Sequence, residues 1–163
     1  MSELNDSMRE FLAGCHYATL ATLNDDGSVH QTPVWYLFKD GNFYLTTGSS
    51  GRKARNLLNR SEATILVDSR RNQGHERWVS AVGTAEIIKG EKSKEINSKI
   101  ISRYLTKEGM DDPRVAGVFE ASGDATICIT PDSWKAFEFS TVDKQFFGGI
   151  LGETPDKWFN VVD

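Results

Sequence analysis

Apolar and polar residues alternate along most of the chain with the two-residue period of β-strands. Together with many β-branched and aromatic residues, this alternation predicts six to seven strands. They cover residues 17–23, 29–38, 43–47, 63–69, 77–88, 125–130 and 133–139. Asp-Gly pairs at 26–27 and 40–41 are typical of hairpin turns, so we expect the first three strands to form a meander.

Three positions predict irregularities in these strands. Pro33 has no N–H to donate to a neighbouring strand, which favours an edge strand or a bulge. Gly83, midway along a long strand, indicates a bulge or a tight bend. Pro131 and Asp132 predict a turn between the last two strands.

Apolar residues at helical spacing predict two to three short helices. The first carries Met8, Phe11 and Leu12 on one side. An amphipathic helix is expected at residues 91–104 and a further short helical turn at 115–120.

Strands joined mostly by hairpins argue against a doubly wound parallel sheet. They predict a mainly β, α+β fold, which is a small antiparallel barrel decorated by helices. The length of 163 residues fits one domain over residues 1–163. The tail at 141–163 has no clear period but carries four large aromatic side chains. We expect it to dock on its own domain or on a second subunit, because these side chains are costly to leave in water.

The stretch at 43–60 joins a strand to a short helix through a Gly-Ser-Ser-Gly joint at 48–51. One of the two serines is placed to cap the helix. Arg52, Lys53 and Arg55 crowd its first turns, where the helix dipole disfavours cations. Exposed N–H groups, hydroxyls and fixed cations therefore predict a phosphate or carboxylate site. A solvated basic surface is the alternative, and the glycine spacing excludes a P-loop.

Composition narrows the possible partners. The net charge of −4 and the pI of about 5.4 argue against nucleic-acid binding. No apolar run approaches the roughly 20 residues that span a membrane, and the acidic N-terminus is unlike a signal peptide, so we expect a cytoplasmic protein.

Cys15 and Cys128 lack metal-type spacing and are interpreted as small buried thiols. His16, His30 and His75 are equally scattered, so no metal site is predicted.

Two hairpins followed by a strand that ends in threonine, a Gly/Ser joint, Arg-Lys and a helix resemble the pyridoxamine 5′-phosphate oxidase-like family. The resemblance covers residues 11–88 and is most specific at 47–53. It implies an antiparallel split β-barrel, usually a homodimer, that holds FMN at the subunit interface. The true oxidases carry Arg and Lys where this chain has Gln31 and Tyr36. The sequence is therefore more similar to the reductase and general-stress branches.

The resemblance also implies a set of site residues. Arg52 and Lys53 fall on the family's phosphate-binding pair, and Trp78 falls on a position that contacts the flavin. The strand at 31–36 corresponds to the one whose backbone lies along the isoalloxazine ring. Thr46 and Thr47 match the family's strand-end positions that contact the flavin on its ribityl phosphate side. The serine hydroxyls and the Asn56 amide can reach the same ligand. The predicted cofactor-binding residues are therefore Gln31, Thr32, Pro33, Val34, Trp35, Tyr36, Thr46, Thr47, Ser49, Ser50, Arg52, Lys53, Asn56 and Trp78.

The activity implied by the resemblance is redox chemistry. Hydride passes from a nicotinamide donor or another small substrate to the flavin and then to an acceptor that the sequence does not identify. No catalytic residue is predicted, since the protein mainly positions the flavin. A deazaflavin-dependent reductase is the first alternative, and a non-catalytic flavin- or haem-binding stress protein is the second. Arg70 and Arg71 are interpreted as part of a solvated loop.

Overall fold

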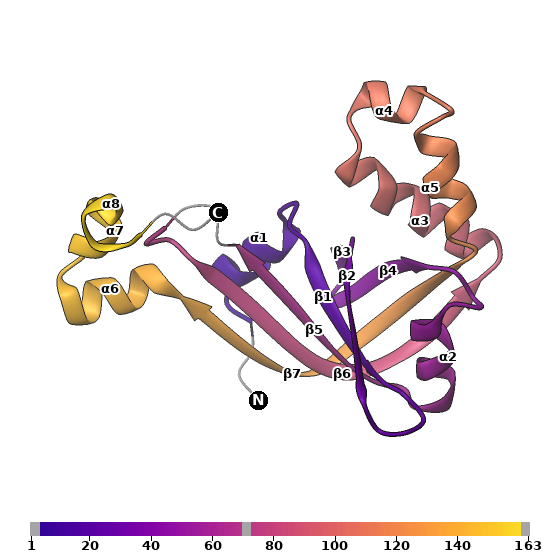
Figure 1. Ribbon diagram of the computed structural model, residues 1–163, viewed down its shortest axis with the longest axis horizontal. Helices are drawn as coiled ribbons and strands as arrows, with labels where there is room; N and C mark the ends of the chain where they lie inside the picture. The colour runs from indigo at the N-terminus through magenta and orange to yellow at the C-terminus, as the bar shows by residue number, and fades with distance from the viewer. Residues whose placement is uncertain (1–3, 70–72, 161–163) are drawn as a thin grey trace.

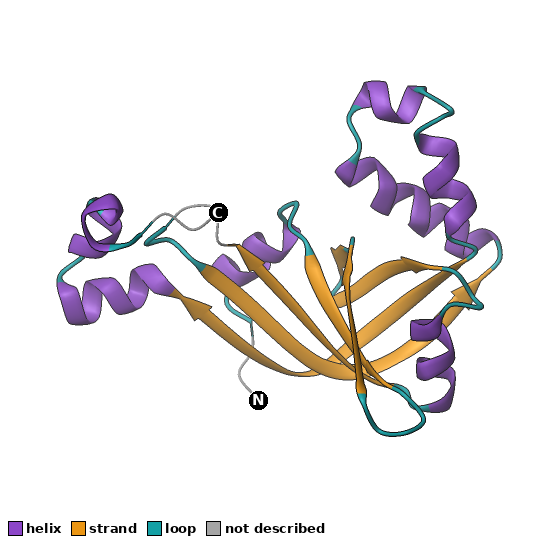
Figure 2. Cartoon of the chain, in the orientation of Figure 1, coloured by secondary structure: helices purple, strands orange, loops and turns teal. Residues whose placement is uncertain are grey.

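The structure is a computed structural model that describes residues 4–69 and 73–160. Arg70 and Arg71 lie outside the described residues. One curved antiparallel sheet forms the body of the molecule; most helices gather at its two ends, and the first helix lies between these groups (Figures 1 and 2). Its strands are β1 (Ala18–Leu23), β2 (Val29–Val34), β3 (Leu37–Lys39), β4 (Asn42–Thr47), β5 (Glu62–Ser69), β6 (Arg77–Lys89) and β7 (Ala125–Glu138).

The strand order β2-β1-β5-β6-β7-β4-β3 explains why the barrel is split. The two edge strands, β2 and β3, follow each other directly in the chain and are joined only by Trp35 and Tyr36. This short link brings the two edges of the curled sheet close together without a hydrogen-bonded ladder between them. The predicted mainly β split barrel is therefore confirmed, and the predicted edge position of Pro33 is confirmed with it.

Two strand boundaries differ from the prediction. Residues 29–38 were expected to form one strand, but the chain leaves one sheet edge after Val34 and joins the other edge at Leu37. The turn expected at Pro131 and Asp132 is wrong, because β7 runs through both residues as one long strand.

The long strands β6 and β7 bend where Pro131 lies opposite Gly83. The pairing register shifts between Val82 and Gly83, which confirms the predicted irregularity. A β-carbon on Gly83 would lie 2.1 Å from the carbonyl oxygen of Thr130, so only glycine permits this close approach. The bulge bends the ladder without ending it.

The helices are more numerous than predicted. The expected helices appear as α1 (Asp6–Ala13), α2 (Arg52–Asn59), α3 (Glu91–Tyr104) and α5 (Ala116–Ser122). Lys107–Asp111 adds the short helix α4. The tail, which has no clear period, folds into α6 (Phe139–Phe147), α7 (Ile150–Glu153) and α8 (Pro155–Trp158).

The core lies inside the curve of the sheet. Alternate positions of the central strands point inward, and α1 adds apolar side chains from one end. Fully buried members include Leu12, Leu20, Tyr36, Phe43, Leu45, Ile65, Val67 and Ile127. In β1, β4 and β5 buried positions alternate with less buried ones, so the period-two pattern was visible in the sequence.

The tail extends from β7 at the end of the sheet opposite to α3–α5 (Figure 1). It contacts its own chain at the loop before β6, where the side chain of Gln73 donates to the carbonyl oxygen of Asn160 at 2.6 Å. Phe146 and Phe147 nevertheless stay 68% and 50% exposed, so the described chain leaves much of their apolar surface uncovered. Their docking on a second subunit stays a prediction.

Candidate functional site

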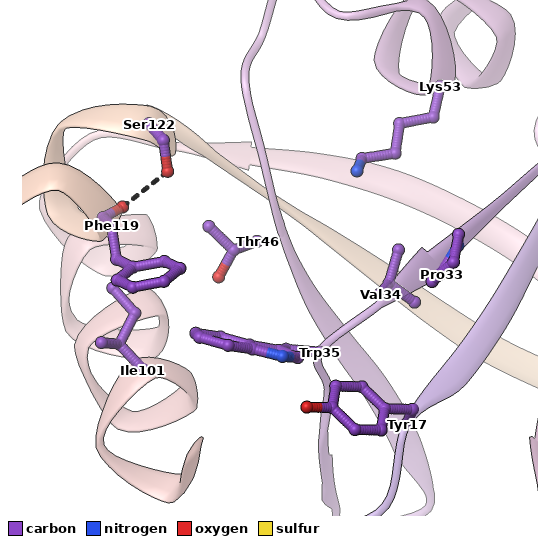
Figure 3. Close-up of a pocket in the computed structure, with 9 residues that line it drawn as sticks. All are labelled: Tyr17, Pro33, Val34, Trp35, Thr46, Lys53, Ile101, Phe119 and Ser122. Carbon is purple, nitrogen blue, oxygen red and sulfur yellow. Dashed lines mark hydrogen bonds between the residues drawn. The ribbon is translucent and has the colours of Figure 1, made fainter. Parts of the chain in front are cut away.

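A cavity of about 280 Å³ opens where the ends of β2 and β4 meet helices α2, α3 and α5 (Figure 3). The sheet supplies its floor, while α3 and α5 close one side. It is lined by Tyr17, Pro33, Val34, Trp35, Thr46, Lys53, Ile101, Phe119 and Ser122. Five of the predicted cofactor-binding residues thus meet in one place, although they come from three separate stretches of the chain.

Trp35 forms the apolar wall of this cavity and is held firmly. Its indole stacks on Tyr104 of α3 at 4.8 Å and on Phe119 of α5 at 4.7 Å between ring centroids. The Tyr104 hydroxyl donates to the carbonyl oxygen of His16 at 2.6 Å and accepts from the backbone N–H of Tyr36 at 3.1 Å. These contacts fix the link between the two sheet edges, so the wall is preformed.

Lys53 is the cationic group of the cavity. Its side chain reaches from the first turn of α2 toward the space between Thr46 and Pro33 (Figure 3). Among residues 4–69 and 73–160 no carboxylate forms an ion pair with it. Burial lowers the pKa of Lys53 below its usual value of 10.5, because the charged form is poorly solvated there. An anionic group in the cavity would pair with the charge of Lys53 and offset its poor solvation.

Arg52 faces a different hollow, although it is next to Lys53 in the chain. This second hollow, of about 450 Å³, lies between α2 and the turn from β1 to β2. Its lining is polar and consists of Asn24, Asp25, Asp26, Ser28, Arg52, Arg55, Asn56 and Asn59. Adjacent helical residues point about 100° apart, which accounts for the separation of the predicted phosphate pair.

Asn56 has a structural role in this second hollow. It is 7% exposed, and its side-chain amide donates to Thr22 Oγ1 and to Asn24 Oδ1, both at 3.0 Å. These bonds tie α2 to β1 and to the turn that follows it. The amide donors are thereby used within the chain.

The Gly-Ser-Ser-Gly joint differs from its prediction in one respect. Neither serine caps α2: its N-cap is Gly51, with no side-chain bond. Instead the backbone N–H and the hydroxyl of Ser49 both donate to Asp124 at 2.6 Å, and they lower the pKa of that carboxyl group. Ser50 is exposed, and the buried Thr47 hydroxyl donates to the carbonyl oxygen of Gly48 at 3.3 Å.

The other predicted site residues lie outside the lining of the cavity. Tyr36 is fully buried, and its hydroxyl donates to the carbonyl oxygen of Leu12 at 3.0 Å. Trp78 stacks on Phe137 of β7 at 6.0 Å. Gln31 is exposed on β2, and Thr32 has a buried hydroxyl without a hydrogen-bond partner in the described part of the chain.

Sequence reasoning missed Tyr17, Ile101, Phe119 and Ser122 as lining residues. The sequence signalled α5 only as a short helical turn, and nothing in its pattern indicated which strand end it covers. The interpretation of Cys15 as a buried thiol is wrong, because it is exposed with its Sγ 3.2 Å from the carbonyl oxygen of Arg103; Cys128 is buried as expected.

The described residues contain neither a metal cluster nor a membrane-spanning helix. In residues 4–69 and 73–160 no three His, Cys, Asp or Glu side chains lie where they could hold a metal ion together. Over the same residues, no helix has the length and apolar character needed to cross a membrane.

The fold and the cavity place the chain among split-barrel proteins, and the comparison with known families specifies which ones. Residues 4–136 match the family model described as pyridoxamine 5′-phosphate oxidase. Since this is most of the chain, the protein belongs to the pyridoxamine 5′-phosphate oxidase-like family, as the resemblance predicted. No curated protein sequence matches the chain.

Solved structures share the fold at low sequence identity. A conserved hypothetical protein, Rv2991, from Mycobacterium tuberculosis is 23% identical with a TM-score of 0.71, over 87% of this chain and 89% of that one. A protein named F420 reductase is 20% identical with a TM-score of 0.59, over 83% and 98%. An FAD-binding protein from Mesorhizobium loti is 15% identical with a TM-score of 0.60, over 83% and 95%.

Proposed function

We propose that the protein is an FMN-binding oxidoreductase that works as a homodimer, with the flavin at the subunit interface. When bound, the flavin supplies reversible two-electron chemistry between a reduced donor, such as a nicotinamide, and an acceptor of unknown identity. The observation that carries the proposal is the cavity that Lys53 shares with the apolar wall of Trp35. Within the described part of the chain, Lys53 forms no ion pair there.

The residues of the cavity fit the chemistry of FMN. The cofactor needs an apolar slot for its ring and a cation for its phosphate, and Trp35 and Lys53 offer these within one space. The Trp35 indole already stacks on two rings of its own chain, so it would meet the flavin with its edge. Pro33 and Val34, which also line the cavity, would place the β2 backbone beside the ring.

The size of the cavity supports the dimer. Sites for small molecules usually enclose about 300–1,000 Å³, and the 280 Å³ of one chain lies just below this range. Trp78, which the family resemblance assigns to the flavin, is not among the lining residues of the same chain. A second copy could supply it and close the open side.

The first experiment tests whether and where the chain binds FMN. Purified protein should be yellow or should quench the fluorescence of added FMN, and mass spectrometry should identify the released chromophore. Lys53→Met should weaken FMN binding by at least about tenfold, since a charge-assisted hydrogen bond contributes about 1.5–3 kcal/mol. Arg52→Met serves as the matched control and should have a much smaller effect, because Arg52 faces the second hollow.

Four results would contradict the proposal or change its details. Protein that neither carries nor binds FMN would overturn it. If Arg52→Met is the more harmful change, the phosphate lies in the second hollow instead. Tighter binding of a deazaflavin coenzyme, the chemistry named in one structural neighbour, would favour a deazaflavin-dependent reductase. Bound flavin without turnover of a nicotinamide donor would favour a passive stress protein.

A further inference from the structure

A buried network of hydrogen bonds lies directly behind the cavity and fixes the hydroxyl of Thr46. Its centre is Asn97 of α3, which is 4% exposed. The side-chain oxygen of Asn97 accepts from the Thr46 hydroxyl at 3.2 Å and from the Thr126 hydroxyl at 2.7 Å. Its amide nitrogen donates to the carbonyl oxygens of Gly123 and Ala125, both at 3.1 Å.

The two carbonyl groups determine the direction of every bond in this network. A carbonyl oxygen only accepts, so the NH₂ group of Asn97 must face Gly123 and Ala125, and its oxygen must face Thr46. The single hydroxyl proton of Thr46 is then used inside the protein. Toward the cavity, Thr46 presents only lone pairs.

Gly123 lies directly against the Thr46 side chain in this arrangement. A β-carbon on Gly123 would lie 2.2 Å from Cγ2 of Thr46, so the methyl group packs directly against the glycine backbone. The backbone of Gly123 is extended, with φ −130°, and any residue could adopt it. The need for glycine here therefore comes from the Thr46 methyl group.

Ser122 is a second residue on the cavity wall whose hydroxyl proton is used within the chain. Its hydroxyl donates to the carbonyl oxygen of Phe119 at 2.8 Å, as the dashed line in Figure 3 shows. Thr46 and Ser122 both have their protons engaged, while Lys53 offers only donors. The cavity therefore has an acceptor side and a cationic side.

We propose that Asn97 and Gly123 are positioning residues that make Thr46 a fixed hydrogen-bond acceptor for an O–H or N–H group of the bound flavin. This inference rests on the proposed function and adds the orientation of the ligand. A phosphate has only acceptor oxygens at neutral to alkaline pH, so it is repelled by the acceptor side and lies at Lys53. The ribityl hydroxyls and the ring N–H of the flavin are the donors that suit Thr46.

Titration with FMN and with riboflavin, which lacks the phosphate, tests this orientation. Thr46→Val keeps the shape but removes the acceptor, and it should weaken the binding of both ligands by the same factor, about five- to tenfold. Lys53→Met should weaken FMN alone. Thr46→Ser keeps the acceptor and should weaken both ligands less than Thr46→Val does. Thr130→Val, at an exposed position in the middle of β7, is the control that should change nothing.

A second set of variants tests the positioning residues. Gly123→Ala should weaken both flavins and lower the melting temperature, because the new methyl group collides with Thr46 Cγ2. Adding Thr46→Ser removes that methyl group and should return both properties to those of Thr46→Ser alone. Asn97→Leu should weaken binding, and combining it with Thr46→Val should cause no further loss, since both act on one hydrogen bond.

The outcomes separate this inference from the proposed function. Normal riboflavin binding by Thr46→Val, or a loss confined to FMN, would overturn the acceptor role. Failure of Thr46→Ser to rescue Gly123→Ala would overturn the positioning role. Wild-type protein that binds neither flavin would contradict the proposed function and the acceptor role, whereas the melting temperatures of the Gly123 variants would still decide whether Gly123 positions Thr46.

Discussion

At the scale of single residues, Lys53 is the group whose surroundings are most informative. Its charge lies in a cavity with apolar walls and no anionic partner in the described chain, and burial lowers its pKa. In the ligand-free protein the unfolded chain holds this proton more tightly than the folded one. The destabilisation by charged Lys53 is therefore present below the folded-state pKa and disappears as pH rises toward 10.5.

This shift predicts a pH dependence of ligand binding. As pH rises through the lowered pKa of Lys53, the side chain loses its charge and the preference for FMN over riboflavin should fall. The ratio of the two dissociation constants is the quantity to measure, because ionisation of the flavin ring affects both ligands alike. Lys53→Met should give a ratio that does not depend on pH; a ratio independent of pH in the wild type would contradict the phosphate role of Lys53.

At the scale of elements, the close approach of β6 and β7 decides the shape of the sheet. Gly83 lies against the backbone of Thr130 and Pro131, and the register shift beside it lets both long strands bend. Such a bend brings the α3–α5 end of the sheet over the ends of β2 and β4, where the cavity lies.

We expect Gly83→Ala to destabilise the protein by at least about 2 kcal/mol, because a methyl group has no room beside a rigid carbonyl oxygen. Gly117→Ala in α5 is the matched control. Nothing lies within 4 Å of its new methyl group, and alanine favours a helix, so stability should stay the same or rise by up to about 1 kcal/mol. Urea unfolding measures both changes, and equal effects of the two substitutions would argue against the tight approach.

At the scale of the whole molecule, one chain leaves both a partly open cavity and exposed aromatic side chains. The cavity contains Lys53 but not Trp78, and the tail exposes Phe146, Phe147 and Trp158. In a two-fold symmetric dimer each subunit would contribute to both sites. Sedimentation should therefore give twice the 18.2 kDa of a single chain.

Mixed dimers test whether each site uses both subunits. Lys53→Met and Trp78→Ala should each weaken FMN binding alone. An equal mixture of the two variants is unfolded and refolded so that their subunits exchange. Half of the dimers are then mixed, and if the two residues meet across the interface, each mixed dimer has one intact site. About a quarter of all sites should therefore bind FMN normally. No recovery in an exchanged mixture would place both residues in the same subunit's site, and a monomer that binds FMN normally would exclude the dimer.

Local patterns in the sequence determined the class of fold and the position of the cationic joint. Period-two alternation and Asp-Gly turns indicated an antiparallel β protein, and Pro33 and Gly83 marked an edge and a bend correctly. The first helix was also predictable, since Met8, Phe11 and Leu12 are buried together. These features depend on neighbours in the chain, so the sequence alone contains them.

Only the tertiary structure decided which residues share the cavity. Residues 29–38 divide between two sheet edges because the curled sheet brings those edges together, and no local signal reports that. Likewise Arg52 and Lys53 look like one cationic pair in the sequence but face two hollows, because the helix packs with Ala54 and Leu57 inward. The Thr46 hydroxyl acts as an acceptor toward the cavity because it donates its proton to Asn97, which lies 51 residues away in the sequence. Contacts between distant segments determine side-chain direction, and they exist only once the chain has folded.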